Sequence, residues 1–114
     1  METFEKHLKN EARKFFPFAC SLNQTNHLAD LLISNGRYCV LIEAKHREKF
    51  SLELYEKTQP LQHRSLQKAG GFVIWKKRNT GLHTLFSVPN SVTICRDKPL
   101  KYIFEILEKQ FLDF

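Results

Sequence analysis

The hydrophobic residues follow a helical period near both ends of the chain and gather in short runs between those ends. Near the N-terminus they recur every three or four residues, at Phe4, Leu8, Ala12 and Phe15. This spacing predicts a first helix that ends near Phe16, because Pro17 follows it. Towards the C-terminus, Pro99 precedes a similar apolar stripe, which is formed by Leu100, Ile103, Phe104, Leu107 and Phe111. We expect a final helix there that packs on the core through this face.

The central part of the chain predicts strands and one further helix. Short apolar runs indicate strands at 18–22, 28–34, 37–45, 72–75, 82–88 and 92–95. Thr58 suits an N-cap, Pro60 suits a first helical turn, and Gly70-Gly71 is a signal for the end of a helix. The inner side of this helix is expected to carry Gln62, Leu66 and Ala69. No clear element is predicted for 46–57, which has a mixed composition.

The order of strand, helix and strand predicts a right-handed crossover. This connection makes the strands 37–45 and 72–75 parallel, whereas the hairpin-connected strands are antiparallel. We therefore expect an α/β (α+β) fold in which helices flank a mixed sheet.

A hairpin turn decides which side chains share a face of this sheet. Asn35-Gly36 lies between two apolar runs and is the strongest short-range signal for a two-residue type I′ turn. With the turn there, Asp30 pairs with Leu41 and becomes a diagonal neighbour of Glu43. Because side chains alternate between faces, Asp30, Glu43 and Lys45 then project from one face, with the two acids about 7–8 Å apart between backbones. A slip of one residue would turn Asp30 to the opposite face.

Two acids and a lysine on one face predict a metal-dependent nuclease. Mg²⁺ prefers one or two carboxylates, waters and a substrate phosphate, so the expected ligands are Asp30, Glu43 and the carbonyl of Ala44. Lys45 would then face the attacking water or the phosphate. The alternative is that the acids merely end their strands and Lys45 is their ion-pair partner. Ionised groups within apolar strands are costly unless they are paired or metal-bound, and this favours the metal site.

Length and charge narrow the function further. The 114 residues suffice for one domain, 1–114, and the formal net charge is +6. Basic residues cluster at 45–47, 63–64 and 76–78, which favours a polyanion such as nucleic acid, although a generally basic protein is the alternative. The three cysteines are far apart and predict reduced thiols. No signal peptide and no membrane-spanning stretch is recognised, so we expect a cytoplasmic, intracellular protein with no membrane partner.

The chain resembles the PD-(D/E)XK nuclease superfamily in the order of a leading helix, Asp30, Glu43-Ala44-Lys45 and Gln62. Within it, 62–66 followed by 70–74 is similar to the helix and strand of RecU-type and archaeal-type Holliday junction resolvases and of VRR-NUC domains. The resemblance covers about the first three-quarters of the chain. It implies a restriction-endonuclease-like fold with a βαβ crossover around the active site.

The resemblance also implies roles for individual residues. Asp30 and Glu43 would hold one or two metals, and Lys45 would assist the attack of water. Many resolvase relatives add a Glu from the first helix near the metal and a catalytic Gln from the helix after the motif, which match Glu11 and Gln62. From the pattern alone, Glu11 is either directed at the site or partly exposed, and Glu5, near the edge of the apolar stripe, is the other acid that the first helix could contribute. Gln62 is either near the site or a surface residue.

Two departures from the resemblance stand out. RecU-type sequences usually have His before that Gln, whereas here Leu61 precedes Gln62 and His63 follows it. The chain is also shorter than bacterial RecU, so by analogy a compact phage, viral or archaeal-like resolvase fits better.

The expected function is a Mg²⁺-dependent endodeoxyribonuclease, with Mn²⁺ as a substitute, that resolves Holliday junctions in recombination and repair. Junction resolution needs paired incisions, so we expect a homodimer with two sites. The expected DNA contacts are Arg47, His63, Arg64, Lys76 and Lys77. Alternatives are a nuclease of the same fold that acts on flaps, ends or duplex DNA, and a catalytically silent nucleic-acid-binding protein.

Overall fold

The computed structural model describes residues 3–22 and 29–112, without the side chains of the last two. The chain forms four helices and six strands in this part. In order, they are α1 (Phe4–Ala12), β1 (Phe18–Ser21), β2 (Leu31–Ser34), β3 (Cys39–Arg47), α2 (Leu52–Thr58), α3 (Pro60–Ala69), β4 (Phe72–Lys77), β5 (His83–Ser87), β6 (Val92–Lys98) and α4 (Leu100–Leu112). The N-terminal end of the second predicted strand, at Leu28, lies outside the described residues.

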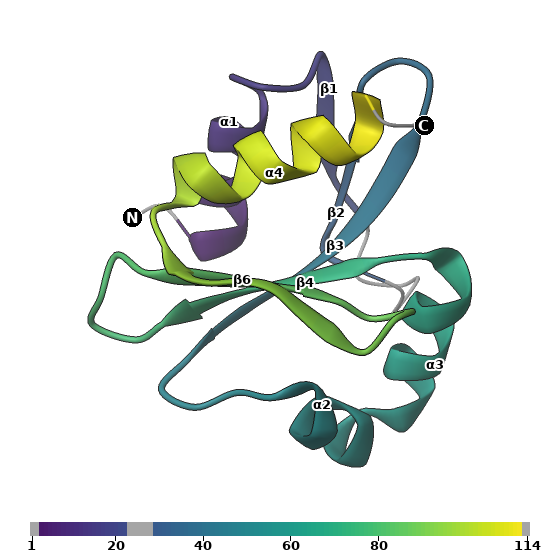
Figure 1. Ribbon diagram of the computed structural model, residues 1–114, viewed down its shortest axis with the longest axis vertical. Coiled ribbons are helices and arrows are strands. Elements are labelled where there is room, and N and C mark those ends of the chain that lie inside the picture. Colours follow the sequence, from purple (N-terminus) through teal and green to yellow (C-terminus); the bar gives the residue numbers. More distant parts are fainter. Residues whose placement is uncertain (1–2, 23–28, 113–114) are drawn as a thin grey trace.

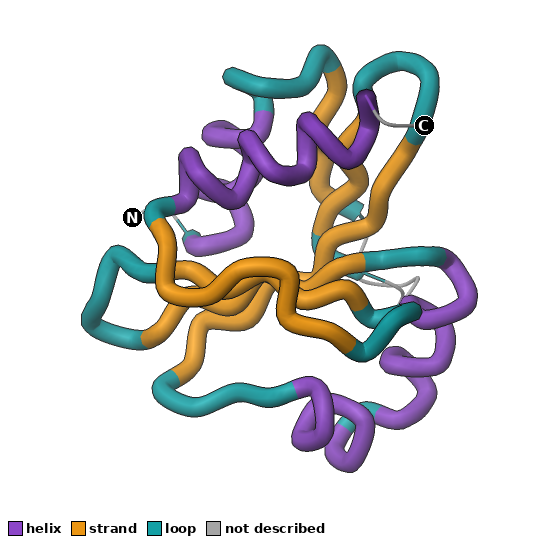
Figure 2. Tube along the Cα trace, in the orientation of Figure 1, coloured by secondary structure: helices purple, strands orange, loops and turns teal. Residues whose placement is uncertain are grey.

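The six strands form a single sheet in the order β1-β2-β3-β4-β5-β6. Its strands pair antiparallel except for β3 and β4, which are parallel. The predicted mixed sheet is therefore confirmed. Helices α1 and α4 cover one face of the sheet, and α2 and α3 lie on the other (Figure 1). Figure 2 shows the same three layers, with the twisted strands between the two pairs of helices.

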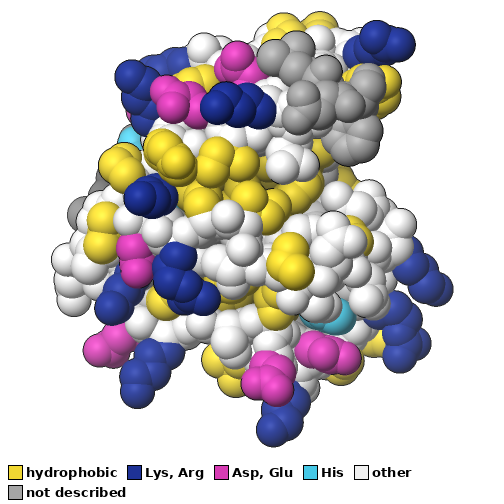
Figure 3. Space-filling model, viewed as in Figure 1, with side chains coloured by type: hydrophobic (Ala, Val, Ile, Leu, Met, Phe, Trp, Pro, Cys, Tyr) yellow, Lys and Arg dark blue, Asp and Glu magenta, His cyan; other side chains and the backbone are white. Residues whose placement is uncertain are grey.

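Each face of the sheet buries its own apolar cluster. The larger cluster lies beneath α1 and α4 and includes Leu8, Ile42 and Phe104, whereas the smaller one lies beneath α2 and α3 and includes Tyr55 and Trp75. In the space-filling view, hydrophobic side chains gather across the middle of the face below α4, and charged side chains lie around them (Figure 3). No helix in the described part of the chain is long and apolar enough to cross a bilayer.

The hairpin between β2 and β3 differs from the predicted two-residue turn. Ser34 pairs with Cys39, so the loop contains four residues, and only Gly36 in it has a positive φ, of 92°. The side chain of Asn35 closes the loop, since its Oδ1 accepts hydrogen bonds of 2.8 Å from the N–H groups of Arg37 and Tyr38. The register is therefore shifted by two residues. A shift of two preserves the alternation of faces, so the side chains expected on one face remain there.

Two helices also differ from prediction. The first helix ends at Ala12 rather than near Phe16. Residues 46–57, for which no element was predicted, contain all of α2 except its last residue, and Ser51 caps the helix by accepting a hydrogen bond of 3.1 Å from the N–H of Leu54. The expected N-cap Thr58 is the last residue of α2 instead.

The predicted end of α3 is confirmed, and its two glycines serve different purposes. Gly70 is the C-cap with φ 77°, in the left-handed region that glycine adopts at no steric cost. A Cβ on Gly71 would lie 2.3 Å from a carbon of Leu66, so Gly71 permits close packing of strand on helix. On the inner side of α3, Leu66 is buried as expected, but Ala69 is exposed and His63 is buried in its stead.

Candidate active site

A pocket of about 410 Å³ opens where the carboxyl half of β3 meets the start of α1 and the junction of α2 and α3. Four separate segments of the chain contribute to it. Its lining residues are Thr3, Phe4, Glu5, Asp30, Glu43, Ala44, Lys45, His46, Arg47, Gln59 and Gln62. Most of these side chains are polar, which distinguishes the pocket from the apolar clusters on either side.

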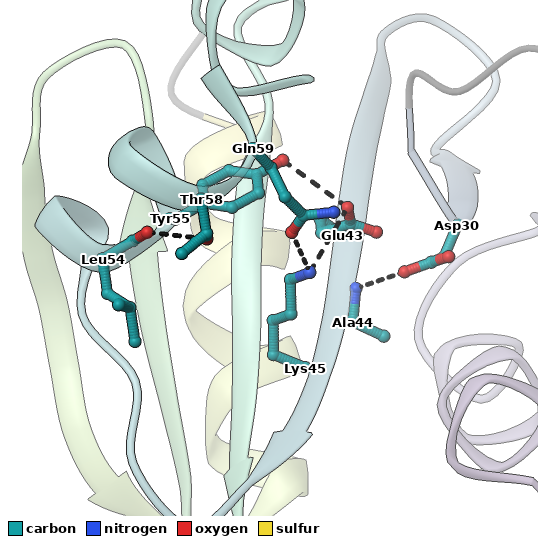
Figure 4. Close-up of polar contacts among 8 residues, drawn as sticks. All are labelled: Asp30, Glu43, Ala44, Lys45, Leu54, Tyr55, Thr58 and Gln59. Atoms are coloured by element: carbon teal, nitrogen blue, oxygen red, sulfur yellow. Dashed lines mark hydrogen bonds and ion pairs between the residues drawn. The ribbon is translucent and has the colours of Figure 1, made fainter. Parts of the chain in front are cut away.

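Asp30 lies just before β2, and its side chain, not its backbone, accepts the hydrogen bond of one N–H group of β3. Its Oδ2 accepts a hydrogen bond of 2.7 Å from the N–H of Ala44 (Figure 4). This bond holds the Asp30 carboxylate beside the strand that carries Glu43. The two acids predicted to share a site therefore line one pocket.

Glu43 is the most perturbed acid of the site. Its side chain is only 3% exposed. Burial raises the pKa of Glu43 to about 9, helped by hydrogen bonding and repulsion with Asp30, while the ammonium of Lys45 opposes the shift. Glu43 Oε2 lies 4.0 Å from Lys45 Nζ and accepts a long hydrogen bond of 3.5 Å from the hydroxyl of Tyr55. The positive charge near Glu43 is thus too small to balance the two acids.

Lys45 points to the same side of the strand as Glu43. Its Nζ donates a hydrogen bond of 2.6 Å to Oε1 of Gln59 and lies 5.2 Å from the centre of the Tyr55 ring (Figure 4). Burial lowers the pKa of Lys45, and the nearby Glu43 partly offsets this. Asp30, Glu43 and Lys45 are therefore brought together in one pocket, as the sequence predicted.

The acid that α1 contributes is Glu5 rather than Glu11. Glu5 lines the rim of the pocket, and partial burial together with the charge of Asp30 raises its pKa. Glu11 lies outside the pocket and forms an ion pair of 3.1 Å with Lys14. The first turn of the helix, and not its third, therefore lines the pocket.

Two glutamines line the pocket, and the sequence pointed to only one of them. Gln62 is present as predicted, and its buried Oε1 has no hydrogen-bond partner among the described residues. Gln59, which holds Lys45, was missed, as was Tyr55. The position of Gln59 directly before Pro60 was a signal for the helix start and not for the site.

Of the five expected DNA contacts, four are basic residues on strand ends or on the surface of α3, and the fifth, His63, is buried. Arg47 lines the mouth of the pocket, and β3 and β4 place it directly beside Lys77, with Lys76 one position earlier. Arg64 is exposed on α3. His63, by contrast, is only 6% exposed and packs against the edge of Tyr55, with 5.6 Å between ring centroids. Burial therefore makes His63 a packing residue and not a surface contact for phosphate.

The residues of the pocket fit a hard divalent cation in their chemistry. Two carboxylates and a neighbouring backbone carbonyl are oxygen ligands of the kind that Mg²⁺ accepts, with water or phosphate completing its shell. The described residues contain no cluster of three or more His, Cys, Asp or Glu side chains that could hold a metal ion. The donor set consequently fits an open two-carboxylate site and not a closed protein cage.

Comparisons with known proteins bear on the fold. No family model and no curated protein matches the chain. Among solved structures, it is similar to Hjc, a Holliday junction resolvase from the archaeal hyperthermophile Archaeoglobus fulgidus, with 24% identity and a TM-score of 0.51 over 75% of this chain and 74% of that one. The fold expected from the PD-(D/E)XK resemblance is confirmed, and the chain has the restriction-endonuclease-like fold of the archaeal resolvase.

Proposed function

We propose that the protein is a metal-dependent DNA endonuclease that cuts branched DNA, with the four-way junction as its substrate. The observation that carries this proposal is the buried Glu43 carboxyl beside Asp30 and Lys45 in an open, polar pocket. A buried acid beside a second, half-buried acid, with one ammonium nearby, is costly for folding and suits a cation. The likeness to an archaeal Holliday junction resolvase supports the choice of substrate.

In this proposal Asp30, Glu43 and the carbonyl of Ala44 hold Mg²⁺, and Mn²⁺ can replace it. When bound, the ion would act as a Lewis acid and would lower the pKa of a water molecule. Lys45 places a positive charge where negative charge develops on the scissile phosphate. The unpaired Oε1 of Gln62 accepts a hydrogen bond from the attacking water or from the substrate.

Two basic residues, Arg47 at the end of β3 and Lys77 at the end of β4, form a positively charged surface on which the DNA can leave the pocket. Arg47 and Lys77 lie side by side in the parallel register, and within the described part of the chain neither forms an ion pair with an acid. Adjacent like charges are unfavourable unless an anion binds between them. A DNA backbone that leaves the pocket over the ends of β3 and β4 would supply that anion. Paired cuts in a four-way junction would then require a homodimer.

The test is to incubate the purified protein and its Glu43→Gln variant with Mg²⁺ and labelled four-way junction, linear duplex or single-stranded DNA. We expect symmetric nicks in the junction and a loss of about 100-fold or more in the variant. Cleavage of flaps or plain duplex instead would keep the site and replace the substrate. Binding without any cleavage that depends on Glu43 would refute the nuclease and favour a silent DNA-binding protein.

A further inference from the structure

Helix α2 presents two side chains to the candidate active site. Tyr55 and Gln59 are four residues apart, which places them on one side of a helical turn, and the N–H of Gln59 donates a hydrogen bond of 2.8 Å to the carbonyl of Tyr55. Gln59 is the C-cap of α2 and the N-cap of α3. Its carbonyl accepts a hydrogen bond of 2.9 Å from the N–H of His63, so both helices hold its backbone. Both residues point towards Lys45 and Glu43 on β3 (Figure 4).

The contacts of Lys45 are unusual for a lysine beside a glutamate. The hydrogen bond of Lys45 Nζ to Gln59 Oε1, at 2.6 Å, is far shorter than its distance of 4.0 Å to Glu43 Oε2. The ring of Tyr55 lies on another side of the ammonium, 5.2 Å from it. A lysine side chain has a flexible four-carbon stem, so the short hydrogen bond to Gln59 is the contact that fixes the place of its ammonium.

Tyr55 is itself firmly placed. Its side chain is 1% exposed and lies against Phe50 and His63, with ring centroids 6.0 Å and 5.6 Å away. Its hydroxyl group also reaches Glu43. One aromatic side chain thus limits the movement of both the ammonium and the carboxylate.

We propose that Tyr55 and Gln59 are positioning residues that hold Lys45 Nζ beside Glu43 and away from direct pairing with it. The carboxylate oxygen of Glu43 then stays open towards the pocket, and the ammonium keeps one place relative to it. The catalytic consequence rests on the proposed nuclease function, whereas the placement of Lys45 does not. The two can therefore be tested separately.

The first measurement is the rate at which Lys45 is acetylated in the folded, metal-free protein, read by mass spectrometry of its peptide. In the wild type this rate is expected to be low, since the side chain is only 7% exposed. Gln59→Ala should raise it several-fold, whereas Gln59→Glu, which keeps an acceptor oxygen, should leave it low. Gln67→Ala makes the same chemical change at an exposed site of α3 and serves as the matched control.

The second measurement is the single-turnover cleavage rate, together with the Kd for labelled junction DNA. Gln59→Ala should slow cleavage about 10-fold to 100-fold while the Kd stays within the error of the wild type, because a residue that orients a catalytic group acts on the rate. Tyr55→Phe keeps the ring and should have the smaller effect. Tyr55→Leu removes it and should resemble Gln59→Ala if the variant folds.

An unchanged acetylation rate of Lys45 in Gln59→Ala would overturn the proposal, whatever the cleavage assay shows. Faster acetylation with normal cleavage would also overturn it, since the place of Lys45 would then be irrelevant to catalysis. If the wild type cuts no DNA, the nuclease function fails, and acetylation alone decides whether the two side chains hold the lysine.

Discussion

Replacing Glu43 by Gln is expected to stabilise the metal-free protein while it abolishes cleavage. Burial and the neighbouring Asp30 raise the pKa of Glu43 to about 9 from a usual value of 4.5, so folding at pH 7 must take up a proton or bury a charge. Over the 2.5 pH units between 4.5 and 7, this lowers the free energy of unfolding by about 3 kcal/mol, at 1.36 kcal/mol per unit. Glutamine mimics the protonated, neutral form that Glu43 has in the folded protein at pH 7, so the expected gain is about 3 kcal/mol, or roughly 12 °C in Tm.

The assay is urea unfolding in EDTA at several pH values. Because the unfolded state releases the Glu43 proton near pH 4.5 and the folded state keeps it until about pH 9, the contribution of Glu43 to wild-type stability should fall as pH rises between these limits. The advantage of Glu43→Gln should be small at pH 5 and grow towards pH 8. Glu105→Gln, at an exposed site of α4, should change stability by less than about 0.5 kcal/mol.

Two results would refute this reasoning. One is a Glu43→Gln variant that is no more stable than the wild type at pH 7 in EDTA, and the other is an advantage that does not depend on pH. Added Mg²⁺ should stabilise the wild type and not the variant, since ligands stabilise the state that binds them.

Three further predictions concern other parts of the molecule. Glu5→Gln should reduce Mg²⁺-dependent cleavage at least 10-fold, as loss of a group near a metal site typically does, and Glu11→Gln should not, so equal activities would contradict the placement of the two acids. Burial lowers the pKa of His83 to about 4, so the contribution of His83 to stability should fall by about 3 kcal/mol as pH drops from 6.5 to 4. The difference in urea stability between the wild type and His83→Leu over this range measures that contribution. Gly71→Ala should cost about 1–3 kcal/mol because its Cβ would strike a buried leucine, whereas Gly81→Ala, which has open space, should be nearly neutral in the same unfolding assay.

The fold was largely readable from the sequence because its elements have strong local signals. The mixed sheet, the parallel pairing of β3 with β4 and the helix that ends at Gly70 follow from apolar runs and glycine signals. The face shared by Asp30, Glu43 and Lys45 was also predicted, even though the turn type was wrong. The error was harmless because the register moved by two residues, which is the period of a strand.

Helix α2 could not be predicted, because only one of its residues is buried in full and its exposed residues show no clear period. Its one buried residue, Tyr55, packs against Phe50 before the helix and His63 on α3, within the apolar cluster beneath α2 and α3. Local propensity is weak in a helix of seven residues, so tertiary packing decides whether it forms. The two side chains that hold Lys45 were missed for the same reason.

Whether Glu5 or Glu11 reaches the pocket also depends on tertiary packing and not on local sequence signals. The spacing of apolar residues identifies the inner stripe of α1, but both acids lie close to that stripe, and the stripe contains no information on where along its length the helix meets β3. That position depends on how α1 packs against the sheet and on the contact of Phe4 with His46 and His83, at ring distances of 5.5 Å and 5.9 Å.

The sequence by itself determined which strands form and which face of the sheet carries the two acids and the lysine. It also determined that the protein has a positive net charge. These properties follow from side-chain periodicity and charge, which are local. Only the tertiary structure decided that Glu5 joins the pocket, that His63 is buried and that Tyr55 and Gln59 contact Lys45. Those facts depend on the distance and angle between elements far apart in the chain, and packing of the whole core sets such distances.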